Sequence, residues 1–222
     1  MKKIIYLNSG HFSGDPGAIV EGFRESEENQ KIRDALVPKL KAEGFEVVVI
    51  PDTLDLRKSI DLVNQNARDL EDGLGIDIHL NRDSGIASGT EVYFYAGSQA
   101  SKDKAEVLSR NISQILRIPD RGARPDTSSS VGSLGWVRQV NCWSFVVEVL
   151  YLDHPLGAVS KFIKEKQYDL IAEGILNGVR ELYGIYTAVV YTADTDVKLN
   201  YLQTLINQIR EQIRQLLLKI KK

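Results

Sequence analysis

The chain has 222 residues, 43% of them hydrophobic, and its 28 basic and 30 acidic side chains give a formal net charge of −2. This length and apolar content suffice for one sizeable core with a small appendage. The near balance of charge excludes a global attraction to nucleic acid or to an anionic membrane. The single cysteine, Cys142, excludes an internal disulfide framework and a cysteine-based zinc cluster, and we expect it in the core.

The N-terminus begins with two lysines, as a signal peptide does, but the apolar run that follows covers only residues 4–7. This run is too short for the core of a signal peptide, and no run in the chain approaches the roughly 20 apolar residues of a membrane span. We therefore expect a first buried strand, no membrane insertion, and synthesis in the cytoplasm with any export by other means.

Short runs rich in β-branched and aromatic residues predict five strands, at 3–8, 46–50, 77–80, 90–95 and 144–150. Apolar residues at helical spacing predict helices between them and after the last, at 25–43, 56–71, 101–117 and 156–183. Alternating strands and helices predict an α/β fold with a central, mostly parallel, twisted sheet covered by helices. The polar stretch 118–135 is predicted to be a long loop.

The C-terminal part has a different pattern. Residues 199–220 carry apolar side chains at alternating steps of three and four, with isoleucines at the a positions 206, 213 and 220. The pattern predicts a main domain at 1–186, a linker at 187–198 and an amphipathic or coiled-coil helix at 199–222. This helix could dock on the main domain or self-associate into a homo-oligomer, and both alternatives remain open.

Three histidines, His11, His79 and His154, limit any histidine-based site. His11 follows the first predicted strand and His79 lies at the end of another, so parallel strands would bring both to one edge of the sheet. His154 precedes a proline and is interpreted as a turn residue. A structural role for His11 and His79 and a shared metal are both compatible with this placement.

Two histidine ligands would need a third donor, and in the absence of a cysteine cluster a carboxylate is expected. Four glutamates near the start of the helix after His11 are candidates: Glu21, Glu25, Glu27 and Glu28. Acidic residues in a first helical turn also stabilise the helix dipole, which accounts for most of the cluster without a metal. Asp15 lies in the turn "GDPGA" and is a candidate partner for His11 outside the metal.

Glu148 lies inside the apolar run "CWSFVVEVLYL", in a strand predicted to be buried. Burying an unpaired charge is unfavourable, so such a residue is usually paired or functional. Arg138 is a candidate partner. Function is the preferred interpretation, because burial raises a carboxyl pKa toward the range useful for proton transfer.

Four segments together resemble the zinc-dependent N-acetylmuramoyl-L-alanine amidases, which include bacterial cell-wall enzymes and phage endolysins. The resemblance covers about residues 3–184. "GHFSGDPGA" is similar to the family's first histidine element, "GFRESEEN" to its Glu-x-x-x-Asn helix start, "IDIHLN" to its Ser-Ile-His-x-Asn segment, and "FVVEVLYLDH" to the strand with its catalytic glutamate. Phe12 and Ser13 replace two glycines of the family pattern, and Val149 and Leu150 replace a Gly-Phe pair.

The resemblance implies one zinc ion per chain, held by His11, Glu25 and His79, with Glu148 as the catalytic general base and acid. It implies peptidoglycan as the substrate, cut at the amide between the lactyl group of N-acetylmuramic acid and L-alanine of the stem peptide. Neighbouring residues could support the metal or meet substrate carboxylates: Asp15, Asn81, Arg82, Arg121 and Arg124.

Two other interpretations are kept. One is a zinc hydrolase acting on a different peptide or amide, although no His-Glu-x-x-His helix is present. The other is an inactive module that binds peptidoglycan or activates a partner. The four intact site residues disfavour the second. The setting that we expect is an endolysin released at lysis.

Overall fold

The computed structural model describes residues 1–12, 14–154 and 162–185, together with Gln203, Ile206 and Arg210 of the C-terminal part. Residues 1–185 form one compact unit, and residues 186–222 form a second. The three described residues of the second unit are helical, and the rest of the predicted heptad helix lies outside the described residues. No helix in the described part of the chain is both long and apolar enough to cross a membrane.

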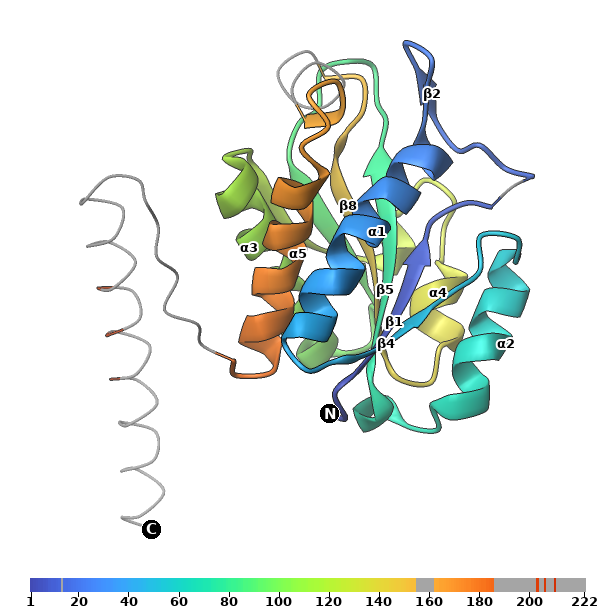
Figure 1. The fold of residues 1–222 in the computed structure, drawn as a ribbon, viewed down its shortest axis with the longest axis vertical. Coiled ribbons are helices and arrows are strands. Elements are labelled where there is room, and N and C mark those ends of the chain that lie inside the picture. The colour runs from blue at the N-terminus through green and yellow to red at the C-terminus, as the bar shows by residue number, and fades with distance from the viewer. Residues whose placement is uncertain (13, 155–161, 186–202, 204–205, 207–209, 211–222) are drawn as a thin grey trace. The chain divides into compact units, whose positions relative to one another are not determined.

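A six-stranded sheet organises the first unit, in the order β4-β1-β5-β8-β6-β7 (Figure 1). The strands are β1 (Ile4–Ser9), β4 (Glu46–Val49), β5 (Leu74–Asn81), β6 (Thr90–Phe94), β7 (Asp120–Pro125) and β8 (Trp143–Tyr151). Neighbours are parallel except β6 and β8, which pair antiparallel. The predicted mostly parallel α/β sheet is therefore confirmed.

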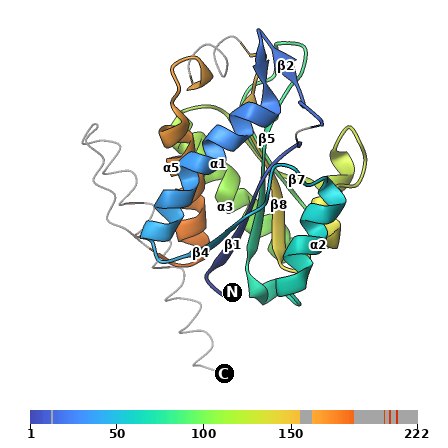
Figure 2. The same ribbon diagram turned by 45° about the vertical axis from the view of Figure 1, so that its right-hand side comes forward.

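Helices cover both faces of the sheet (Figure 2). The helices α1 (Glu25–Ala42), α3 (Gln99–Leu116) and α5 (Tyr168–Leu182) pack on one face over the larger apolar core. The other face carries α2 (Leu56–Asn66) and α4 (Gly135–Gln139), over a smaller core that includes the buried Cys142. Both faces of the central strands are thus covered, as expected for parallel strands with continuous apolar runs.

The remaining elements are short. A two-stranded hairpin, β2 (Ile19–Val20) and β3 (Phe23–Arg24), leads directly into α1. Two 3₁₀ helices, η1 (Leu70–Asp72) and η2 (Asp126–Ser128), follow α2 and β7. The hairpin places Glu25 at the first position of α1, and this fixes where its carboxylate can point.

Three sequence predictions about elements are corrected. The stretch 118–135 is not one loop, because β7 and η2 lie within it. Of the helix predicted at 156–183, residues 156–161 lie outside the described residues, and Phe162 and Ile163 are in a short π-helical turn. The helix α5 begins only at Tyr168, because Lys166 has a φ of 54°, in the left-handed region that an α-helix cannot include. The helix predicted to reach 71 ends at Asn66, where Ala67 becomes extended.

Candidate metal centre

The carboxyl ends of β1 and β5 bring His11 and His79 together. His11 follows β1 and adopts a φ of 71°, a left-handed conformation that is uncommon outside glycine. His79 is the sixth residue of β5. Their ring centroids lie 5.0 Å apart, so the two imidazoles are neighbours at the same edge of the sheet.

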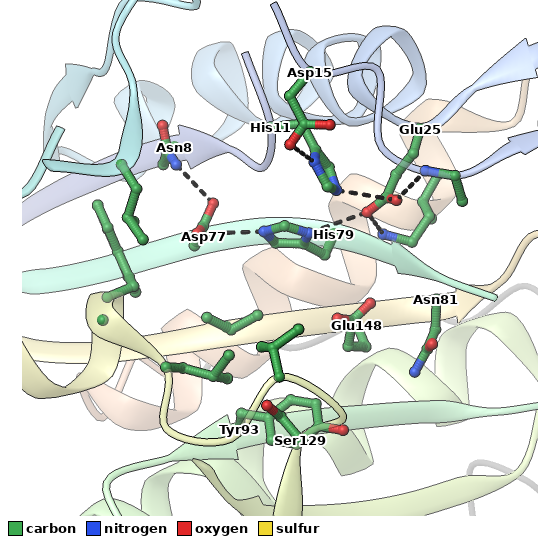
Figure 3. A pocket seen from close by; sticks show the side chains of 18 of the residues that line it. Asn8, His11, Asp15, Glu25, Asp77, His79, Asn81, Tyr93, Ser129 and Glu148 are labelled. Atoms are coloured by element: carbon green, nitrogen blue, oxygen red, sulfur yellow. Dashed lines mark hydrogen bonds and ion pairs between the residues drawn. The ribbon is translucent and has the colours of Figure 1, made fainter. Parts of the chain in front are cut away.

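Glu25 lies between the two histidines (Figure 3). Its Oε2 is 3.1 Å from His11 Nε2 and its Oε1 is 3.0 Å from His79 Nδ1. Backbone N–H groups of Ala18 and Leu80 donate to the same two oxygens, at 2.9 and 3.1 Å. The carboxylate is therefore held in place by the backbone on both sides.

One ligand atom from each of His11, Glu25 and His79 lies within 4.8 Å of the others. Two imidazoles and a carboxylate in this arrangement match the donor set of catalytic zinc sites, which leave a fourth position open. The backbone makes room for the rings: a Cβ at Gly17 would lie 2.5 Å from the His11 ring, and Gly17 has a φ of 65°. The residues present therefore fit a zinc ion.

The other three glutamates near α1 have partners of their own. Glu21 pairs with Lys164 at 2.6 Å and Glu27 with Arg24 at 3.8 Å. Glu28 is buried and accepts hydrogen bonds from Lys31 and from the Tyr168 hydroxyl, each at 2.6 Å. Of the four candidates, the structure brings only Glu25 to the histidines among the described residues.

The ionisation of these groups follows from their contacts. Burial alone would raise the pKa of Glu25, but hydrogen bonds from His11 and His79 outweigh burial and hold that pKa well below its usual range. Burial alone would lower the pKa of each histidine. The carboxylate of Glu25 reverses this for His11, and those of Asp77 and Glu25 reverse it for His79, so both pKa values rise. In the metal-free site these carboxylates therefore favour protonated histidines, and a bound metal ion would have to displace those protons.

Glu148 lies on β8, directly across from His79 in the strand register. Its Oε2 is buried and has no hydrogen-bond partner within the described ranges. Burial raises the pKa of its carboxyl to about 7. Arg138, the partner considered from sequence, binds Asp126 instead, at 2.5 Å.

A cavity of about 510 Å³ contains the three candidate ligands and Glu148. This volume is in the range of small-ligand sites. Further along, its wall is largely apolar and comes from the start of α2 and from α4 with the segment before it: Leu54, Leu56, Val131, Leu134 and Trp136. The cavity therefore joins a polar end, with the candidate ligands, to an apolar surface.

The five residues predicted to support the metal or to contact the substrate divide into two groups. Asp15 Oδ2 lies 2.8 Å from His11 Nδ1, and Asn81 and Arg82 line the cavity. Arg121 and Arg124 are not among the described residues that line the cavity; instead both approach the buried Glu91, at 2.7 and 3.6 Å.

Sequence reasoning missed several polar residues of this cavity, among them Asn8 and Asp77, which are hydrogen-bonded to each other next to His79. The signal for Asp77 was available, because alternation along a strand puts residues 77 and 79 on the same face.

Comparison with known proteins agrees with this geometry. Residues 5–181 match the family model described as N-acetylmuramoyl-L-alanine amidase. The chain is 26% identical over 187 residues to the uncharacterized protein YqiI of Bacillus subtilis, and this match covers 82% of this chain and 85% of YqiI. It is also 27% identical over 182 residues to the N-acetylmuramoyl-L-alanine amidase LytC of the same organism. This second match covers 81% of this chain but only 35% of LytC.

A solved structure shares the fold. The catalytic domain of CwlV, an N-acetylmuramoyl-L-alanine amidase from Bacillus (Paenibacillus) polymyxa var. colistinus, superimposes with a TM-score of 0.70 at 25% identity. The match covers 84% of this chain and 100% of that domain. The family match extends from β1 to within α5 and so includes every element of the candidate metal centre. The chain belongs to the N-acetylmuramoyl-L-alanine amidase family.

Proposed function

We propose that the chain is a zinc-dependent peptidoglycan hydrolase that cuts the amide between the lactyl group of N-acetylmuramic acid and L-alanine of the stem peptide. The observation that carries the proposal is the approach of His11, Glu25 and His79 to one point, beside Glu148, whose Oε2 is buried without a hydrogen-bond partner among the described residues. Family membership and the likeness to LytC and CwlV support the choice of substrate.

The three ligands would hold one zinc ion, which in such sites lowers the pKa of a bound water to about 7 and polarises the carbonyl under attack. Glu148, on the adjacent strand, would accept a proton from the attacking water and deliver it to the departing amine. A pKa near 7 suits both steps, because the carboxyl group can gain and lose a proton at neutral pH. Arg82, in the cavity wall, is a candidate contact for a stem-peptide carboxylate.

Digestion of purified peptidoglycan, followed by mass spectrometry of the products, tests the proposal. We expect intact stem peptides with free L-alanine amino termini, and their loss when a chelator is added or Glu148 is replaced by alanine. Zinc-dependent cuts at other bonds would show that the chain acts on a different amide. Zinc binding without any released product would favour an inactive peptidoglycan-binding or activating module.

We also propose that residues 1–186 are the catalytic domain and that residues 199–222, after a linker at 187–198, form a helix that assembles several chains. Several linked domains on a polymeric wall would gain avidity from contacts that are individually weak. Sedimentation of the full chain against a chain ending at residue 186 tests the assembly. If both chains sediment as monomers, assembly is excluded, and docking of the helix on the main domain is the remaining alternative.

A further inference from the structure

A second carboxylate, that of Asp77, lies against His79 on the side of the ring away from Glu25. Asp77 precedes His79 by two positions on β5, so both side chains point from the same face of the sheet. Asp77 Oδ2 lies 3.4 Å from His79 Nε2, and the Asp77 side chain is only 5% exposed (Figure 3). The two ring nitrogens of His79 therefore face two different carboxylates.

The backbone at Gly10 closes the Nε2 edge of the ring. A Cβ added at Gly10 would lie 2.1 Å from His79 Nε2, so only glycine allows this approach. The Gly10 N–H donates to the Ile78 carbonyl at 2.7 Å, which extends the β1–β5 pairing up to the ring. With Nε2 covered in this way, Nδ1, at 3.0 Å from Glu25 Oε1, is the nitrogen available to a metal.

Asn8 fixes the carboxylate of Asp77. The two residues are register partners on β1 and β5, and Asn8 Nδ2 donates to Asp77 Oδ1 at 2.8 Å. This bond occupies one oxygen of Asp77 and leaves Oδ2 directed at His79. Neutral imidazole carries its proton on one nitrogen only, so a histidine bound to a metal through Nδ1 has an N–H at Nε2 to donate to that oxygen.

His11 has the same arrangement with its nitrogens exchanged. Its Nε2 faces Glu25 and its Nδ1 lies 2.8 Å from Asp15 Oδ2. The two aspartates differ in exposure, because the side chain of Asp15 is 48% exposed and that of Asp77 is 5% exposed. Solvent screens the interaction of Asp15 more strongly, so the buried Asp77 should have the larger influence on its histidine.

We propose that Asp77, held by Asn8, is a positioning residue that fixes the tautomer and ring orientation of His79 as a metal ligand. This inference rests on the proposed function, because it requires a metal at His11, Glu25 and His79. Carboxylates that accept the second N–H of a ligating histidine typically change metal affinity or activity by about 10- to 100-fold when removed. The inferred function of Asp77 is therefore measurable without any substrate.

The experiment measures the zinc dissociation constant of the full chain by competition with a chromophoric chelator. Asp77→Ala should weaken binding by about 10- to 100-fold, and Asp77→Asn by less, because the amide oxygen still accepts the His79 N–H. Asn8→Ala should weaken binding in the same direction, since the carboxylate is then free to rotate. The absorption bands of the Co²⁺-loaded protein, which report ligand geometry, should change in the Asp77 variants.

The matched control is Asp52→Asn. Asp52 is another carboxylate near this end of the sheet, but it is bound to Ser9 at 2.7 Å and to Arg33 rather than to a histidine. Its loss should alter stability while leaving the zinc dissociation constant within about twofold of the unmodified chain. Circular dichroism of each metal-free variant separates loss of folding from loss of binding.

Two results would overturn the inference, and they can be told apart. If the unmodified chain binds zinc and both Asp77 variants match it in affinity and Co²⁺ spectrum, Asp77 is only a buried polar group of the sheet. If the unmodified chain binds no zinc, or binds it equally well after His11→Ala, the proposed metal centre is itself wrong and the function of Asp77 is excluded with it.

Discussion

Two glutamates, Glu148 on β8 and Glu91 on β6, are paired in the strand register and lie in opposite environments. Glu91 accepts hydrogen bonds from Arg121 at 2.7 Å, Asn81 at 2.9 Å and the Tyr93 hydroxyl at 3.2 Å. Glu148 has one buried oxygen with no partner among the residues that the structure describes. Burial of a carboxylate therefore does not by itself indicate catalysis in this fold, and the proposed function of Glu148 depends on its unpartnered oxygen and on its position next to the candidate metal site.

Replacing Glu148 by glutamine is expected to have the largest effect. The amide has nearly the same shape but can neither accept the proton of the attacking water nor return it, so the rate should fall by about 10²- to 10⁴-fold. Zinc content should be unchanged, because Glu148 is not one of the three candidate ligands. The measurements are peptidoglycan turnover and metal analysis of the same preparation.

Glu91→Gln is the matched control for this experiment. It changes the same functional group on the neighbouring strand, and we expect it to retain most of the activity of the folded enzyme. Equal losses of turnover in the two variants would contradict the distinction between the two glutamates.

The same Glu148→Gln change should stabilise the metal-free protein in a pH-dependent manner. The pKa of Glu148 rises from 4.5 to about 7 on folding, so between these values the folded state holds more protons than the unfolded state. Raising the pH through this window therefore lowers the free energy of unfolding of the unmodified chain, and the loss is complete above pH 7.

Glutamine does not titrate, so the variant should gain up to about 3 kcal/mol relative to the unmodified chain between about pH 4 and pH 8. Denaturant unfolding in the presence of chelator, at both pH values, measures the difference. His79 interacts with the charge of Glu148, so the difference between the two proteins reports the titration of this pair. A pH-independent difference would show that Glu148 ionises normally in the folded chain.

Glu91→Gln should have the opposite effect and lower the free energy of unfolding. Its carboxylate accepts a charge-assisted hydrogen bond from Arg121, and the loss of such a bond with its partner left behind typically destabilises by about 1–3 kcal/mol. Unfolding at about pH 8, with chelator, compares the two variants directly. Destabilisation by both substitutions would mean that Glu148 has stabilising contacts after all.

The sequence predicts part of this site. The apolar runs around Ile4–Ser9 and Trp143–Tyr151 predict buried strands, and residues at the ends of parallel strands must lie at one edge. The placement of His11 and His79 at one edge follows from this, and Glu148 is singled out separately, as a charged residue inside an apolar run. Glu25 does not, because four nearby glutamates are equivalent in sequence. The family resemblance selects Glu25 among them, and among the described residues the structure brings only Glu25 to the histidines, while the other three pair with other side chains.

The errors in the predicted elements have equally local causes. β7 has the sequence "DRGARP", which contains no β-branched residue and includes both glycine and proline, so propensity disfavours a strand. It forms because it is an edge strand that needs only β6 as a neighbour, a position where proline is tolerated. In the same way, Phe162 and Ile163 are buried and continue the apolar pattern of α5 without belonging to that helix.

The smallest expected effects lie among the partners of Glu91. Arg121 Nε donates to Glu91 at 2.7 Å, and its guanidinium lies over the Tyr151 ring at 5.2 Å. Arg124 is 3.6 Å from the same oxygen, makes no hydrogen bond to Glu91 among the described contacts, and has a 42% exposed side chain. Arg124→Ala should therefore change the free energy of unfolding by less than about 1 kcal/mol, as exposed ion pairs usually do.

Arg121→Ala should destabilise more, by about 1.5–3 kcal/mol, because it removes a hydrogen bond to a charged group. Urea unfolding of both variants at low and high salt tests this ranking, since salt should reduce the contribution of Arg124 more than that of Arg121. Equal effects would mean that Glu91 uses both arginines. If Arg124→Ala instead leaves stability unchanged and raises KM for peptidoglycan, Arg124 contacts the substrate, because the residue then contributes to binding without supporting the buried glutamate.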